Sequence, residues 1–139
     1  MKNINTLIKI HSRELDTLRQ QVVKCEEEKS QLIKYSNKME EELAVERALA
    51  SQNHELGIIF SNYRRLIRER QEVIEKSLRD LAKKLERINE EIAIKFGEVK
   101  KFEIILANHI SKEKKLAQAR ETKQLDEIAV NNFLNAELD

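Results

Sequence analysis

The stretch SQNHELG, residues 51–57, interrupts a sequence that otherwise consists of strong helix formers. Ser, Asn, His and Gly gather here, and Gly57 can take the left-handed conformation that ends or turns a helix without a Cβ clash. The chain has 139 residues with no Pro, and its other glycine, Gly97, lies within a helical pattern. A chain with so few helix breakers is built from very few, very long helices. We therefore place one turn near residue 55.

The predicted fold is all-α, an antiparallel two-helix coiled-coil hairpin with a longer, overhanging second helix. The first helix runs over about residues 3–50, the turn over about 51–59 and the second helix over about 60–134. These elements form a single domain of residues 1–139. Aromatic residues make up only 4% of the chain, which leaves little for the thick core of a compact domain. A helical hairpin of this length spans roughly 70 Å.

Both helices carry a seam of mostly apolar residues at alternating steps of four and three, the heptad pattern of a coiled coil. In the first helix the seam residues are Ile4, Ile8, His11, Leu15, Leu18, Val22, Cys25, Lys29, Leu32, Ser36, Met39, Leu43, Glu46 and Ala50. In the second helix they are Phe60, Arg64, Ile67, Gln71, Ile74, Leu78, Leu81, Leu85, Ile88, Ile92, Lys95, Val99, Phe102 and Leu106.

Folding the chain near residue 55 predicts the register of the two seams. Leu43 then faces Ile67, and each seam position meets a seam position of the other helix. The acidic run Glu40–Glu42 falls beside Arg68, so the charges support the same register. A shift by one heptad would replace this attraction with mismatch.

The predicted first helix is too short to pair with the whole of the second helix. Ile4 pairs with Leu106, so we expect residues after about 107 to overhang without cover. An apolar face then reappears at helical spacing, formed by Leu125, Ile128, Ala129 and Phe133. A short isolated helix is only marginally stable in water. We interpret this face as a docking helix for another protein; the alternatives are that it frays in solution or pairs with a second copy of the chain.

Charge and composition narrow the classes of partner and location. The net charge is +1, and basic and acidic residues are interleaved, which argues against nucleic acid as a partner. No stretch reaches the roughly 20 apolar residues of a membrane span. The single cysteine, Cys25, permits no internal disulfide and is typical of a reducing compartment. We expect a cytoplasmic protein that contacts the inner membrane only through its partners, at the cytoplasmic face.

The search for catalytic and ligand-binding motifs predicts none. The three histidines are far apart in the hairpin, and no histidine lies near Cys25 in the predicted register. Two glycines forty residues apart cannot form a phosphate-binding loop. We therefore expect a protein that is not an enzyme, with no cofactor, no metal and no small-molecule substrate. Any ATP hydrolysis belongs to a partner.

Three segments resemble the FliJ family of bacterial flagellar export proteins. They are NYRRLI (residues 62–67), FEIILANHISKEKK (102–115) and QLDEIAVNNF (124–133), of which LDEIAVNNF matches best. The resemblance covers most of the chain, including the turn near one third of its length. It implies a soluble coiled-coil hairpin, similar in shape to the central stalk of rotary ATP synthases, that acts in type III protein export, flagellum biogenesis and motility.

The resemblance also implies partners and contact residues. FliJ proteins associate with the hexameric flagellar export ATPase, with the cytoplasmic domain of the export gate and with export chaperones. Carried over by position, the ATPase-binding residues are Leu125, Asp126, Ile128, Ala129 and Phe133. The export-gate contact carries over to Tyr63 and Leu66, although some members have an aromatic residue where this chain has Leu66.

Two other functions agree with the same residues. A generic coiled-coil scaffold or dimerisation protein would show the same seams and the same absence of catalytic motifs. The equivalent stalk of an injectisome-type secretion system would share the mechanism and act in another machine.

Overall fold

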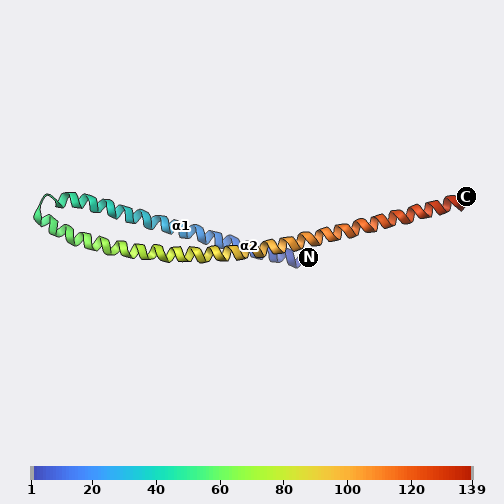
Figure 1. Ribbon diagram of the computed structural model, residues 1–139, viewed down its shortest axis with the longest axis horizontal. Helices are drawn as coiled ribbons and strands as arrows, with labels where there is room; N and C mark the ends of the chain where they lie inside the picture. Colours follow the sequence, from blue (N-terminus) through green and yellow to red (C-terminus); the bar gives the residue numbers. More distant parts are fainter. Residues whose placement is uncertain (1, 139) are drawn as a thin grey trace. The chain divides into compact units, whose positions relative to one another are not determined.

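The computed structural model describes residues 2–138, apart from the side chain of Lys2, and this range contains two helices and no strand. Helix α1 spans Lys2–Ala50 and helix α2 spans His54–Leu138 (Figure 1). The predicted all-α hairpin with a longer second helix is confirmed. Both helices run without a break because no proline removes a backbone donor or forces a kink.

The turn is shorter than predicted and occupies only residues 51–53. The carboxamide oxygen of Asn53 accepts a hydrogen bond of 2.9 Å from the backbone N–H of Glu55, which caps the N-terminus of α2. The backbone N–H of Gly57 donates to the carbonyl oxygen of Asn53 at 3.0 Å, the pairing of a helical turn. Helix α2 therefore begins at His54, and the predicted start near residue 60 is wrong.

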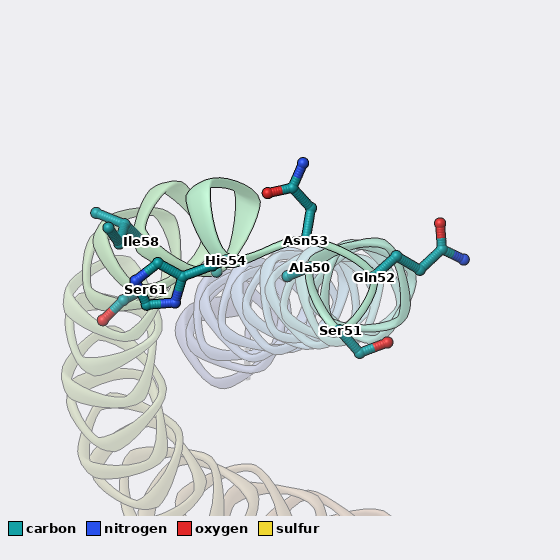
Figure 2. A pocket seen from close by; sticks show the side chains of 8 residues that line it. Ala50, Ser51, Gln52, Asn53, His54, Ile58 and Ser61 are labelled. Carbon is teal, nitrogen blue, oxygen red and sulfur yellow. The ribbon is translucent and has the colours of Figure 1, made fainter.

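Gly57 does not make the turn. No glycine among the described residues has a positive φ, so Gly57 is an ordinary helical residue of α2. Asn53 supplies the local signal instead, because its side chain bonds the backbone two residues on and favours the start of a helix. Figure 2 shows Asn53 in the link between the helices, with Ser51 at the end of α1 and Ile58 on α2.

Residues Glu14–Lys95 form one compact unit, called the turn unit below. Its core lies between α1 and α2 in two clusters of buried side chains. The first contains Cys25, Leu81, Leu85 and Ile88, and the second contains Met39, Leu43, Ile67 and Ile74. Leu32 packs against both clusters. Each buried aliphatic side chain contributes roughly 1.5–3 kcal/mol, so these clusters hold the two helices together.

Side-chain exposure follows the predicted seams. Every seam position in both helices is buried or half-buried, except Lys29, Glu46 and Arg64. These three carry charges that reach water on long side chains. Lys95 stays half-buried because its ammonium group forms an ion pair with Glu14. Cys25 shares a buried cluster with Leu85, and Leu43 shares one with Ile67, which agrees with the predicted register.

One polar side chain lies inside the seam of the turn unit. Gln71 is only 7% exposed, and its amide nitrogen donates to Glu40 Oε1 at 2.9 Å. Arg68 donates to Gln71 Oε1 at 2.7 Å and also forms an ion pair with Glu40. The hydrogen bond from Gln71, followed by that from Arg68, holds the pKa of Glu40 below its usual 4.5. This network satisfies the buried amide and links the two helices.

Residues Met1–Arg13 and Phe96–Asp139 form the second compact unit, called the terminal unit below. Here His11 stacks on Phe102, with ring centroids 5.3 Å apart, and its Nδ1 lies 3.2 Å from Glu98 Oε2. The cover from α1 ends soon afterwards. His109 is the last half-buried side chain, and every residue from 110 to 138 is exposed. Figure 1 shows this part of α2 running on past the N-terminus of α1.

Candidate functional site

The five residues predicted to bind the export ATPase all lie in the exposed end of α2, within the terminal unit. Leu125, Ile128 and Phe133 share one face of the helix, and the exposed fraction of Phe133 is 63%. Ala129 lies on the same face, and Asp126 borders it. The residues predicted from sequence to act together are therefore brought onto one surface.

A second apolar stripe runs along the opposite side of the same helix, and the sequence reasoning missed it. Its residues are Val130, Leu134 and Leu138, spaced four residues apart and all exposed. The signal for it in the sequence is this regular spacing, which a search for a single apolar face does not detect. Residues 125–138, called the C-terminal segment below, therefore carry apolar stripes on two sides of the helix, with polar side chains such as Asp126, Asn131 and Asn135 between them. Such a helix buries both apolar stripes only where other protein contacts it from both sides.

The two residues predicted to contact the export gate lie on α2 in the turn unit. Leu66 is exposed, whereas Tyr63 is half-buried and packs against the second core cluster. Tyr63 also lines a surface pocket together with Val45 of α1. These two residues and the C-terminal segment thus belong to different units of the chain.

Tyr63 and Leu66 are part of a larger exposed apolar surface than predicted. Leu56, Ile59, Tyr63, Leu66 and Val73 follow one another along α2 at heptad-like spacing, beside the seam rather than in it. The neighbouring positions of α1 add Val45 and Leu49, which are also exposed. These residues are called the lateral face below. A search for a second heptad stripe next to the first would have found it in the sequence.

The described residues contain no group of three His, Cys, Asp or Glu side chains able to hold a metal ion. The surface pocket at the turn is lined mainly by short polar side chains, and His54 is its one titratable lining residue (Figure 2). The free thiol of Cys25 is buried in the core. Neither helix, over residues 2–138, contains a stretch with the length and hydropathy of a membrane span. The most distinctive surfaces of the described chain are its exposed apolar faces.

Comparison with known protein families assigns the chain to one of them. The sequence profile described as "Flagellar FliJ protein" matches residues 1–138, which is nearly the whole chain. This chain belongs to the FliJ family. A search of curated proteins and a search of solved structures each found no match. As a member of this family, the chain is a component of the flagellar export apparatus. FliJ proteins are accessory to export rather than catalytic.

Proposed function

We propose that this chain is the stalk of the flagellar export ATPase and that its C-terminal segment binds inside the ATPase hexamer. The observation that carries the proposal is the pair of apolar stripes on residues 125–138, which are exposed on both sides of one helix. A flat groove would cover one stripe and leave the other in water. A site that surrounds the helix, such as the centre of a ring of subunits, covers both.

The apolar side chains of the C-terminal segment supply the driving force for this binding. Burial of one large aliphatic or aromatic side chain contributes roughly 1.5–3 kcal/mol before the costs of association. Phe133 is the one aromatic side chain in the segment, and aromatic residues are frequent anchors of protein interfaces. We assign it the largest single contribution, with Leu125 and Ile128 beside it.

The turn unit supplies the second contact of the proposed stalk. We assign the lateral face, including Tyr63 and Leu66, to the cytoplasmic domain of the export gate, and export chaperones remain further proposed partners. A coiled coil suits this role because its two packed helices resist bending. The hairpin would then connect the ATPase with the gate without any chemistry of its own.

Stimulation of the purified export ATPase tests the proposal. The intact chain is expected to raise ATPase activity or to promote hexamer formation, and Phe133→Asp is expected to abolish most of this effect. Ile94→Asp is the matched control, because Ile94 is 65% exposed on α2 and lies outside the C-terminal segment. Circular dichroism should be the same for all three proteins. Full stimulation by Phe133→Asp, or equal loss with Ile94→Asp, would contradict the proposal.

A further inference from the structure

Gly97 lies inside α2, at a position where neither the backbone nor the packing requires a glycine. No glycine among residues 2–138 has a positive φ, so any residue can adopt the backbone conformation found here. Beyond the local helix backbone and the two chain neighbours, no described atom lies within 4 Å of a Cβ added at Gly97. Alanine would therefore fit at this position and would favour the helix. The glycine lowers the local stability of α2 for a reason other than space.

Gly97 follows the end of the packed core in α2. In this helix the turn unit ends at Lys95 and the terminal unit begins with the next residue. The first buried cluster, together with the side chains packed against it, extends no further than Leu18 in α1 and Ile92 in α2. The least favourable helix residue in the interior of α2 thus comes just after the last apolar cluster that holds the helix in place.

The terminal unit has little buried apolar surface of its own. Val99 is the one buried side chain among its described residues, whereas the turn unit contains two buried clusters. Close to Gly97, the contacts with α1 are those of His11, which lies against Glu98 and stacks on Phe102. A segment with few buried apolar contacts opens locally at a lower free energy than a packed core. This part of α2 therefore receives little support where its own helix propensity is lowest.

We propose that Gly97 is a bending point of α2. The helical hydrogen bonds around Gly97 open transiently, and the helix changes direction there while the two buried clusters of the turn unit stay packed. Such a point absorbs the backbone change within a few residues, as hinges in proteins do. The exposed end of α2 can then change its direction at no cost to the core. The inference concerns the free chain and holds whichever molecule binds the C-terminal segment.

A glycine can also allow the backbone of a partner to approach closely. The bending point is the better explanation here, because the glycine coincides with the end of the apolar clusters and with the weakly packed start of the terminal unit. A contact site for a partner needs neither of these features. The two explanations also predict different behaviour of the free chain.

Hydrogen exchange of the free, full-length chain, followed by NMR, tests the inference. In Gly97→Ala, the protection factors of amides 98–101 are expected to rise about fivefold, because the helical hydrogen bonds of these amides enclose or end at residue 97. Protection factors correct for the different intrinsic exchange rates next to Gly and Ala. Amides 85–92, which lie over the first buried cluster, should change less than about twofold.

Gly57→Ala is the matched control. It makes the same substitution at a helical residue of α2, and its Cβ would lie 3.9 Å from the carbonyl oxygen of Ala50, an ordinary contact. The protection factors of amides 98–101 should be the same in this variant as in the parent chain. A change at these amides in Gly57→Ala equal to that in Gly97→Ala would overturn the inference.

Electron paramagnetic resonance measures the bending itself. Spin labels on cysteines introduced at Glu86 and Asn108, both exposed on α2, are separated by roughly 33 Å of helix rise. All proteins in this experiment carry Cys25→Ala, so that only the introduced cysteines are labelled. The distribution of label distances is expected to be narrower in Gly97→Ala than in the parent, and unchanged in Gly57→Ala.

Three further results would overturn the inference. The first is unchanged protection of amides 98–101 in Gly97→Ala, and the second is an equal rise at amides 85–92, which would mean that α2 opens only when the whole chain unfolds. The third is an equally broad distance distribution in the parent and Gly97→Ala, since the helix would then open without bending. No measurement here uses the export ATPase, so a failure is distinguishable from a failure of the proposed function.

Discussion

Gln71 occupies a seam position where a coiled coil usually has an apolar side chain. It is tolerated because its amide nitrogen donates to Glu40 and its amide oxygen accepts from Arg68. A polar residue at such a position lowers stability relative to a perfect apolar seam but favours one register, since a shifted helix would leave the amide without partners. Gln71 thus links the two helices of the turn unit and favours their observed register.

Removing this side chain tests its contribution. We predict that Gln71→Ala lowers the free energy of unfolding by about 1–2 kcal/mol, because it deletes two hydrogen bonds and leaves a small cavity between the helices. Urea unfolding followed by circular dichroism measures the change. Gln124→Ala is the matched control, since Gln124 is exposed and should give no loss. Equal free energies of unfolding for Gln71→Ala and the parent chain would show that the network does not contribute to stability.

The same network predicts a pH dependence. The pKa of Glu40 is lowered in the folded state, first by the hydrogen bond from Gln71 and then by that from Arg68. This contribution to stability is present in full above the usual pKa of 4.5 and is lost as the pH falls through the lower folded value. In an NMR titration, Gln71→Ala is expected to move the pKa of Glu40 upward toward 4.5. An unchanged pKa in that variant would disprove the assigned cause.

At the scale of the elements, the seams were predictable and the turn was not. A heptad pattern over many turns averages out single exceptions such as Lys29, so the buried positions of both helices follow from the sequence. The turn depends on one local contact, the cap formed by Asn53. In the sequence, both Asn53 and the nearby Gly57 indicate a turn, and spacing alone does not show which of them forms it. The stripe formed by Val130 and Leu134 lies on another side of the helix from Phe133, so a search for a single apolar face does not find it.

The exposed end of α2 should be removable without loss of the fold. Truncation after Gln124 removes the C-terminal segment, in which every side chain of residues 125–138 is exposed, so the turn unit is expected to keep its urea midpoint within error. The same truncation should abolish stimulation of the export ATPase. A clear fall of the midpoint would mean that these residues pack against the body of the chain, contrary to the exposure observed.

The lateral face predicts a separate contact. Leu66→Asp and Val73→Asp each place a charge on this face without touching the buried clusters. Each is expected to weaken binding to the purified cytoplasmic domain of the export gate about tenfold, by desolvating a carboxylate in an apolar contact. Phe133→Asp should bind the gate domain normally. If both lateral variants keep full affinity in calorimetry, the gate binds elsewhere.

At the scale of the whole molecule, the family could be recognised from the sequence because FliJ-like segments occur along most of the chain. The partners could not be derived in the same way. The function of a docking surface depends on the molecule that binds it. Neither the exposure nor the spacing of the apolar residues identifies that molecule. Leu125, Asp126, Ile128, Ala129 and Phe133 therefore stay predictions as contact residues, although they share one exposed part of α2.

The proposed roles of the turn unit and the C-terminal segment follow from where the apolar residues lie. The turn unit buries its seam residues and stabilises itself, whereas the C-terminal segment buries none of its apolar side chains. A chain that forms a coiled coil and then continues as one uncovered helix with exposed apolar stripes is suited to connect two larger partners. Export function would then depend on the exposed helix more than on the core.

Hydrogen exchange of the chain, alone and with the export ATPase hexamer, tests the central claim most directly. In the free chain, amides in residues 125–138 should exchange early because no packing protects them. On addition of the hexamer, we predict strong protection of this segment and little change in the turn unit. Formation of the complex with unchanged exchange in residues 125–138, or with protection confined to the turn unit, would contradict the account.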